Sequence, residues 1–273
     1  MRIIITGGNS GLGKETAAAL AAAGHDIVIA ARDVAKSEQV AAAIGGTVQV
    51  AHLDLADLSS VRSFAASVDA VDVLINNAGV LGLPLDRTTD GFEMHMGINY
   101  LGHFALTCLL SDRITRRVVS VTSMSHVWGR LDLEDLNWHT RAYSKWSAYA
   151  QSKLAVMLFT SELARRGIAA VVVDPGGADT NIVRYDTGFL RWTSHQPWLK
   201  DFPQSAKDAA RASIIAATTD LEPGTYLAPT FKQWGKPRVT RPLKKARDPI
   251  TAAHLWRLSA ALTECEWAKH FSG

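Results

Sequence analysis

Short runs of β-branched and apolar residues alternate with longer stretches of helical spacing along most of this chain. Because the runs are nearly continuous in apolar residues, they are typical of strands buried on both faces of a parallel sheet. The alternation predicts an α/β fold, with a doubly wound parallel sheet of about seven strands and helices on both faces. The expected strands lie at 3–6, 26–30, 47–53, 71–76, 116–123, 168–174 and 224–229.

Helical spacing marks the stretches 13–24, 33–46, 206–219 and 248–264. Gly24 is the expected C-terminal cap of the first helix, and Asp33 is the expected N-cap of the second. The last of these helices begins with Asp-Pro, a favourable helix start. Residues 237–247 are rich in Lys, Arg and Pro, and we expect a basic surface loop there.

Length and composition indicate one soluble globular domain spanning residues 1–273. The formal net charge of +3 is too small to favour a nucleic-acid partner. The two cysteines form no C-x-x-C motif, and no H-E-x-x-H motif suggests a metal site. The chain enters an apolar run at once and holds no stretch of about 18 apolar residues. We therefore expect a cytoplasmic protein without an integral membrane segment.

The stretch "TGGNSGLG" (6–13) lies between the first expected strand and the first expected helix. Its glycines allow a tight turn and a close approach to a ligand, and the following helix would direct free N–H groups at an anion. Glu15 stands where a P-loop needs Ser or Thr, so the stretch predicts a Rossmann-type dinucleotide site instead. The candidate cofactor contacts are Gly7, Asn9, Ser10, Gly11, Leu12 and Gly13.

The end of the second strand, "IAARD" (29–33), bears on the choice between NAD(H) and NADP(H). Neutral Ala30 and Ala31 precede Arg32, whose guanidinium can bind a 2′-phosphate. Asp33 could instead bind a ribose diol, although we expect it to cap the helix. NADP(H) is therefore the preferred expectation. NAD(H) stays open, as does a solvated Arg32 on the surface.

Several fragments occur in the order and spacing of the short-chain dehydrogenase/reductase family, which this chain resembles over about residues 1–230. They are "TGGNSGLG" (6–13), "HLDL" (52–55), "NNAG" (76–79), "INYLGHF" (98–104), "VTS" (121–123), "YAQSK" (149–153) and "DPGGADT" (174–180). The stretch 123–159 carries a long insertion and resembles the retinol dehydrogenase and protochlorophyllide reductase branch. Residues 256–263 resemble that branch too.

The resemblance implies roles for the matched residues. Tyr149 would be the general acid/base, Lys153 its partner, Ser123 a hydrogen-bond donor to substrate, and Asn99 a support of the proton relay. The cofactor contacts beyond the glycine loop would be Asp54 and Leu55 at the adenine, Asn77, Ala78 and Gly79 along the cofactor, Tyr149 and Lys153, and Pro175, Gly176, Ala178 and Thr180 at the nicotinamide. His103 and His126 are expected to be structural or to line the pocket.

A Tyr-x-x-x-Lys pair often arises by chance on the outer face of a helix, so the chemistry of Tyr149 and Lys153 has to justify their roles. Four residues apart, they project from one helical face. Reduction of a carbonyl leaves an alkoxide that needs a proton, and tyrosine has an unperturbed pKa of about 10. Lowering it to about 7 requires roughly 4 kcal/mol of phenolate stabilisation. A nearby ammonium and a positive nicotinamide can provide this in a site shielded from water.

These features predict an NADP(H)-dependent oxidoreductase that interconverts an apolar carbonyl compound and its alcohol. The alternatives are an NADP-binding sensor without turnover and a reductase of another double bond, as in the pigment reductases. The aromatic stretch 184–204 is a candidate substrate lid, because glycine and two prolines interrupt its regular structure. A homodimer and a homotetramer both remain open.

Overall fold

The computed structural model describes residues 1–177 and 205–267. Eight strands in this part of the chain form one sheet. They are β1 (Arg2–Thr6), β2 (Asp26–Ala31), β3 (Val48–His52), β4 (Val71–Asn76), β5 (Ile114–Val121), β6 (Ala170–Val173), β7 (Tyr226–Pro229) and β8 (Pro237–Val239). Every strand expected from the sequence is present, close to its expected bounds.

The strand order is β3-β2-β1-β4-β5-β6-β7-β8, and all neighbours are parallel except β7 and β8. The chain starts near the middle of the sheet and winds outward in both directions, which confirms the doubly wound fold. Strand β8 is a correction, because residues 237–247 were expected to form only a loop. The short antiparallel strand covers the edge of β7, where backbone groups would otherwise lack partners.

Helices and helical turns connect these strands. They are α1 (Gly11–Ala22), α2 (Val34–Ile44), α3 (Leu58–Ala66), α4 (Met94–Met96), the π-helix η1 (Gly97–Leu101), α5 (Gly102–Leu109), the 3₁₀ helix η2 (Met124–Val127), α6 (Lys145–Arg165), α8 (Ala206–Thr218), the 3₁₀ helix η5 (Lys244–Arg247) and α9 (Pro249–Thr263). The expected caps are confirmed: the Asp33 side chain accepts a hydrogen bond from the Lys36 backbone N–H, and Gly24 follows α1 with a φ of 81°.

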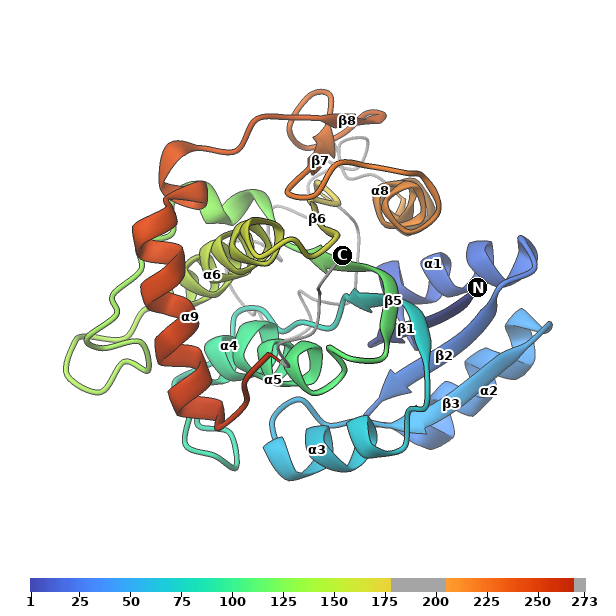
Figure 1. The fold of residues 1–273 in the computed structure, drawn as a ribbon, viewed down its shortest axis with the longest axis horizontal. Helices are drawn as coiled ribbons and strands as arrows, with labels where there is room; N and C mark the ends of the chain where they lie inside the picture. Colours follow the sequence, from blue (N-terminus) through green and yellow to red (C-terminus); the bar gives the residue numbers. More distant parts are fainter. Residues whose placement is uncertain (178–204, 268–273) are drawn as a thin grey trace, which may run out of the picture.

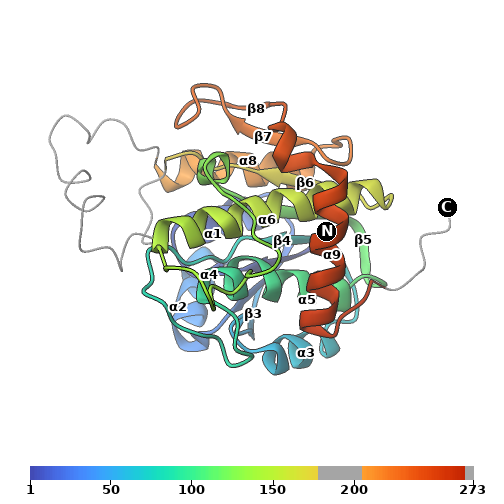
Figure 2. The same cartoon turned by 90° about the vertical axis from the view of Figure 1, so that its left-hand side faces the viewer.

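Helices cover both faces of the sheet, as the near-continuous apolar strands predicted (Figure 1). Alternate residues of β1 point to opposite sides, so Ile3 and Ile5 join the core under α1 and α8. Ile4 faces the other way, into the core under α5 and α6. Helix α9 packs on the outside of α6, as the two views together show (Figure 2).

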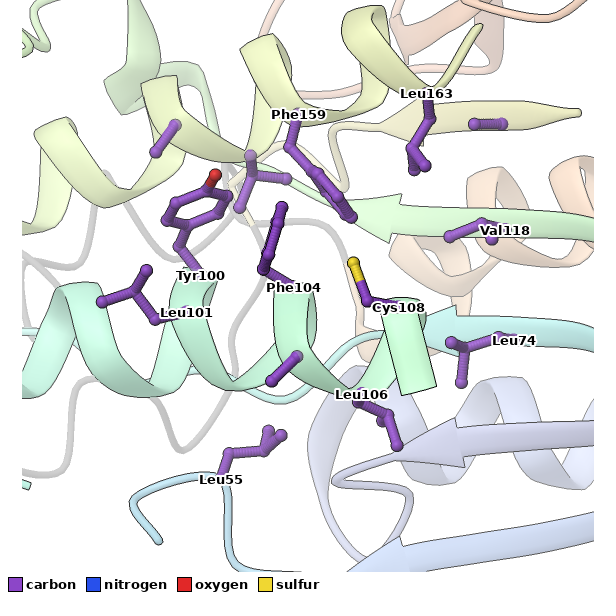
Figure 3. Packing of buried hydrophobic residues seen from close by; sticks show 14 of the residues in the cluster. Leu55, Leu74, Tyr100, Leu101, Phe104, Leu106, Cys108, Val118, Phe159 and Leu163 are labelled. Carbon is purple, nitrogen blue, oxygen red and sulfur yellow. The ribbon is translucent and has the colours of Figure 1, made fainter. Parts of the chain in front are cut away.

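Aromatic rings of η1, α5 and α6 meet in the larger of the two cores (Figure 3), and Trp256 of α9 joins them. The centroid of the Phe104 ring lies 5.6 Å from that of Phe159 and 5.1 Å from that of Trp256. Tyr100 is fully buried beside them, and its hydroxyl pairs with Ser259 Oγ at 2.7 Å. These contacts hold α6, which carries Tyr149 and Lys153, against the helices around it.

A loop between η2 and α6 forms the insertion that separates Ser123 from Tyr149. Asp135 organises it by accepting hydrogen bonds from the backbone N–H of His139 at 2.6 Å and of Thr140 at 3.0 Å. The guanidinium of Arg141 lies 3.6 Å from the centroid of the Trp138 ring. The insertion is thus a folded loop that leads directly into α6.

Within residues 1–177 and 205–267, no helix has the length and apolar character needed to cross a bilayer. The candidate lid at 184–204 lies outside the described residues, as do Ala178 and Thr180. The lid stays a prediction from the sequence.

Candidate active site

A cleft of about 1010 Å³ opens along the carboxyl ends of the parallel strands. This is the edge at which doubly wound sheets bind their ligands. One continuous cavity contains the glycine loop and the Tyr–Lys pair. The predicted residues that line it are Gly7, Asn9, Ser10, Gly11, Leu12, Gly13, Arg32, Asp54, Leu55, Asn77, Ala78, Gly79, Ser123, Tyr149, Lys153, Pro175 and Gly176.

The glycine loop has backbone conformations that favour glycine. Gly7 and Gly11 have φ angles of 65° and 48°, in the left-handed region. A Cβ atom on Gly13 would lie 2.6 Å from Asn77 Nδ2 and would also collide with the carbonyl oxygen of Gly7. Because these glycines have no side chains, the N-terminus of α1 stays open to a phosphate group. The loop therefore suits a dinucleotide.

Cationic groups gather where the end of β2 reaches the cleft. Arg32 is exposed and lines the cavity, and Lys36 lines it from the first turn of α2. Asp33 Oδ1 accepts from Lys36 N at 3.0 Å, so Asp33 acts as a helix cap, as expected. We did not identify Lys36 from the sequence, although its place one turn after Arg32 could have suggested it.

The ends of β1 and β4 are joined at the floor of the cleft. Thr6 Oγ1 accepts hydrogen bonds from the backbone N–H groups of Asn77 and Ala78, each at 2.9 Å. Asn77 Nδ2 donates to the carbonyl oxygen of Thr6 at 2.8 Å. The Asn77 side chain therefore braces the floor, while Ala78 and Gly79 line the cavity beside it.

Tyr149 and Lys153 share one face of α6, and Ser123 approaches them from the loop after β5. Both α6 side chains are buried, with 8% of Tyr149 and 3% of Lys153 exposed. Lys153 Nζ lies 5.8 Å from the centroid of the Tyr149 ring and donates to the carbonyl oxygen of Val121 at 3.0 Å. Their burial in the cleft excludes the alternative of two solvated residues on an outer face.

Burial raises the pKa of Tyr149 to about 12, because a phenolate is poorly solvated in this site. The hydroxyls of Ser123 and Ser125 lower this pKa, and the charge of Asp174 raises it. Burial lowers the pKa of Lys153 to about 8, against the charge of Asp174. In the chain without a cofactor, the Tyr149 hydroxyl is therefore protonated at pH 7.

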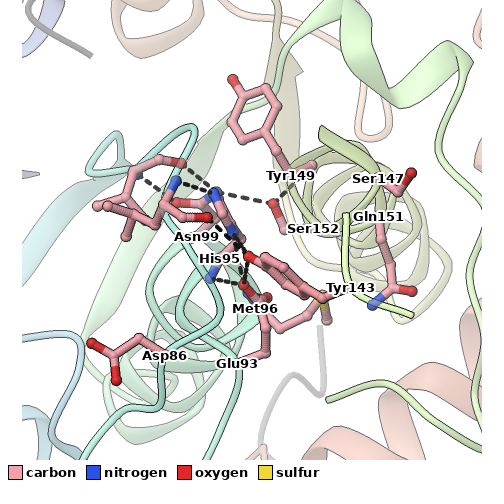
Figure 4. Close-up of polar contacts among 12 residues, drawn as sticks. Asp86, Glu93, His95, Met96, Asn99, Tyr143, Ser147, Tyr149, Gln151 and Ser152 are labelled. Atoms are coloured by element: carbon pink, nitrogen blue, oxygen red, sulfur yellow. Dashed lines mark hydrogen bonds and ion pairs between the residues drawn. The ribbon is translucent and has the colours of Figure 1, made fainter. Parts of the chain in front are cut away.

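In the described part of the chain, Asn99 does not line the cleft but lies beside Ser152 of α6 (Figure 4). Its side chain accepts from the Val80 backbone N–H at 2.8 Å and donates to Ser152 Oγ at 2.9 Å. A Cβ atom on Gly79 would lie 3.2 Å from Asn99 Oδ1 and 3.6 Å from Lys153 Nζ, so the two groups flank the same glycine. The structure brings Asn99 to the pair as a bridge between the π-helix and α6.

His103 connects the floor of the cleft to Asn99. Its Nδ1 donates to the carbonyl oxygen of Asn99 at 3.1 Å, and its Nε2 pairs with Thr6 Oγ1 at 2.9 Å. Burial lowers the pKa of His103 to about 4, so the ring is neutral at pH 7. His126 is buried as well, and its Nδ1 donates to the carbonyl oxygen of Ser123 at 2.7 Å. Both histidines are structural, the first of the two roles considered for them.

A second polar cluster, formed by Glu93, His95 and Tyr143, lies next to Asn99 (Figure 4). Glu93 Oε1 accepts from His95 Nδ1 at 2.7 Å and from the Tyr143 hydroxyl at 3.0 Å. The His95 ring packs edge-on against that of Tyr149, with centroids 6.1 Å apart. No local pattern predicts this cluster, because Glu93 and His95 belong to the start of α4 and Tyr143 to the loop before α6.

Comparison with known proteins agrees with this geometry. The family model described as short chain dehydrogenase matches residues 1–188. The chain belongs to the short-chain dehydrogenase/reductase family. Retinol dehydrogenase 13 of Homo sapiens is 40% identical, over 97% of this chain and 85% of that protein. Retinol dehydrogenase 12 of Homo sapiens is also 40% identical, over 97% of this chain and 87% of that protein.

Among solved structures, an uncharacterised protein from Mycobacterium paratuberculosis shares the fold with a TM-score of 0.86 and 45% identity. The match covers 98% of this chain and 94% of the other. As a short-chain dehydrogenase/reductase, the chain is an oxidoreductase acting on CH–OH or C=O groups with a nicotinamide dinucleotide. The resemblance to retinol dehydrogenases seen in the sequence is confirmed.

Several residues that line this cleft were not predicted from the sequence. Trp128 and Trp146 line it and are 67% and 38% exposed. Ser125 also lines it, and its hydroxyl lies close enough to the Tyr149 hydroxyl to lower the pKa of that group. A third hydroxyl beside those of Ser123 and Tyr149 is suited to bind a polar atom of a ligand. The stretch "SMSHVW" carries both Ser125 and Trp128, but spacing alone does not show which of its residues face the cleft.

Proposed function

We propose that this chain is an NADP(H)-dependent oxidoreductase that interconverts apolar carbonyl compounds and their alcohols, with Tyr149 as the general acid/base. One observation carries the proposal: Ser123, Tyr149 and Lys153 converge in the same cleft as the glycine loop. Arg32 and Lys36 at its β2 end supply the positive charge that favours a 2′-phosphate.

A nicotinamide dinucleotide held in this cleft would supply the hydride to a carbonyl or accept it from an alcohol. During reduction, the Tyr149 hydroxyl gives its proton to the developing alkoxide, and during oxidation the phenolate takes that proton back. The Ser123 hydroxyl donates a hydrogen bond to the substrate oxygen and so stabilises its charge. Lys153, anchored on Val121, places its ammonium beside the phenol and toward the cofactor side of the cleft.

The substrate side of the cleft favours an apolar molecule. Trp128 and Trp146 present indole surface there, and Met124 adds a flexible apolar wall. Pockets that bind apolar ligands combine such walls with a few placed polar groups, here Ser123 and Ser125. The similar human proteins are named for retinol, an apolar alcohol, which supports this substrate class.

The test is a panel of aldehydes, ketones and alcohols, from small to long and apolar, followed at the nicotinamide absorbance with NADPH or NADH. We expect turnover of apolar members and preference for NADPH. Tyr149→Phe should lower turnover by about 10²-fold or more while cofactor affinity stays within about twofold, since only the proton donor is lost. Native rates in this variant would refute the role of Tyr149, and preference for NADH would refute the cofactor assignment.

A further inference from the structure

A buried carboxylate that the mechanism above does not use lies at the end of β6, next to the end of β5 on which Lys153 is anchored. Asp174 is the first residue after β6 and is 1% exposed. Its Oδ1 accepts from the Gly176 backbone N–H at 2.9 Å, and its Oδ2 accepts from the Tyr226 hydroxyl at 3.2 Å. Its own N–H donates to the carbonyl oxygen of Leu227 at 2.8 Å. The sheet, the turn and β7 together fix the position of this carboxylate.

Such a carboxylate is costly unless a positive charge lies close by. Burying an ionised group away from water is unfavourable by roughly several kcal/mol, even after the surrounding protein has relaxed. The two hydrogen bonds to Asp174 come from neutral groups, whereas Lys153 is an equally buried cation. Lys153 Nζ donates to the neutral carbonyl of Val121, so neither group is neutralised by its own hydrogen bonds. Val121, which anchors the ammonium, pairs with Val173 of β6, and Asp174 is the next residue along that strand. The two opposite charges are therefore held at neighbouring strand ends, where each can offset the burial of the other.

We propose that Asp174 is the buried counter-charge of Lys153 and, as a positioning residue, sets the pH range in which the Tyr149–Lys153 pair works. The inference rests on the proposed function only where it concerns the reaction; the charge interaction belongs to the chain itself.

Titratable groups of α6 and β7 interact with Asp174. Lys153 and Tyr149 act on it from α6, and Tyr226 from β7. The His126 ring packs edge-on against the Tyr226 ring, with 5.7 Å between the centroids. Burial lowers the pKa of His126, and the charge of Lys245 lowers it further. Among these groups Lys153 is the buried cation, and its ammonium is anchored on the strand that pairs with β6.

The direction of the effect follows from the charges. Burial raises the pKa of Asp174 to about 6, so the carboxylate is ionised at pH 8. Its negative charge disfavours loss of the Lys153 proton and disfavours formation of the Tyr149 phenolate, so it raises the pKa of both groups. Removing the charge should shift both titrations to lower pH. Below about pH 6 Asp174 is protonated, and the native chain should then behave like a neutral variant.

The experiment measures the titration of Lys153 directly. The cofactor-free chain, labelled with ¹³C at the lysine Cε, is titrated by NMR, and the Lys153 signal is assigned with Lys153→Arg. We expect Asp174→Asn to lower the pKa of Lys153 by about one unit, in line with the effect of a nearby opposite charge. Asp174→Ser, a second neutral variant, should give the same shift if Asp174→Asn folds poorly.

Tyr226→Phe is the matched control, because it removes a hydrogen bond from Asp174 and leaves the charge. Its Lys153 titration should stay within about 0.3 units of the native one, well below the shift expected for charge removal. An unchanged titration in both neutral variants, or an equal shift in Tyr226→Phe, would overturn the proposal.

The reaction provides a second measurement. In Asp174→Asn, the midpoint of the pH dependence of alcohol oxidation should move to lower pH by a shift similar to that of Lys153, and rates of the variant and the native chain should converge below about pH 6. A shifted NMR titration without any turnover would count against the proposed function alone. Turnover with an unshifted NMR titration would count against the counter-charge alone.

Discussion

Lys153 Nζ donates a hydrogen bond to the carbonyl oxygen of Val121, so a side chain from α6 is held at the carboxyl end of β5. The bond places the ammonium beside the Tyr149 ring, at 5.8 Å from its centroid, in the wall of the cleft. A lysine fixed in this way can serve the phenol and the cofactor together, because an ammonium has three protons to donate.

Replacing Lys153 should therefore damage two functions at once. Lys153→Met keeps most of the side-chain volume and removes the charge. We expect turnover to fall by about 10²-fold or more and the cofactor Kd to rise by about tenfold, since charge-assisted hydrogen bonds are lost. Single-turnover kinetics and fluorescence titration with NADPH would measure the two effects. A variant that loses turnover and keeps native cofactor affinity would remove Lys153 from cofactor binding.

Arg32 and Lys36 should decide between the two cofactors. Arg32→Ala removes the guanidinium at the end of β2, and we expect NADPH to bind about tenfold or more weakly, the effect of losing about 1.4 kcal/mol. Lys36→Ala should have a smaller effect in the same direction. NADH affinity should change less than about twofold in both, since NADH lacks the 2′-phosphate. Arg238→Ala, an exposed cation of β8, is the control, and an equal loss for NADH would refute the assignment.

The first turn of α1 should tolerate no side chain at Gly13. In Gly13→Ala the new methyl group would meet Asn77 Nδ2 at 2.6 Å, so the loop has to move. We expect a large loss of cofactor affinity, measured by calorimetry. Gly24→Ala is the matched control, because its new Cβ would meet nothing within 4 Å. Its φ of 81° is nevertheless strained for alanine. That variant should lose about 1 kcal/mol of stability and keep its cofactor affinity.

Glu93 should stabilise the fold in a pH-dependent way. Burial alone would raise the pKa of Glu93, but hydrogen bonds from His95 and Met96 outweigh it and hold the pKa below its ordinary 4.5. A depressed pKa contributes stability above the unfolded value, and this stability is lost as the pH falls through the folded value. Glu93→Gln should cost about 3 kcal/mol at pH 7 in urea unfolding, and less in acid. The exposed Glu38→Gln is the control; a cost independent of pH would contradict this account.

Trp128 should influence the size of the substrate. With 67% of its surface exposed at the cleft, Trp128→Ala is expected to leave the fold intact. We expect KM to rise for long apolar substrates by about tenfold, since an indole contact surface is removed, and to change little for short ones. Steady-state kinetics with a homologous aldehyde series would measure this. A uniform change in KM across the series would place Trp128 outside the substrate wall.

Local pattern was sufficient for most of the fold. The β-branched runs marked each parallel strand, because a strand buried on both faces must be apolar along its whole length. Caps such as Asp33 and Asp248 could be read directly, since a capping side chain acts within its own first turn. Strand β8 was not predicted, because its three residues show no apolar pattern and form a strand only by pairing with the edge of β7.

In the candidate site, too, some features are local in the sequence and others depend on contacts between distant segments. The glycine loop and the four-residue spacing of Tyr149 and Lys153 are local features, so the sequence by itself determined them. The burial of the pair, the approach of Asp174 from β6 and the Glu93–His95–Tyr143 cluster join segments far apart in the chain. The pKa values of Tyr149 and Lys153 depend on that burial and on the charge of Asp174. Only the tertiary structure decided them, because desolvation and through-space charge depend on which groups the fold brings together, and spacing along the chain does not record this.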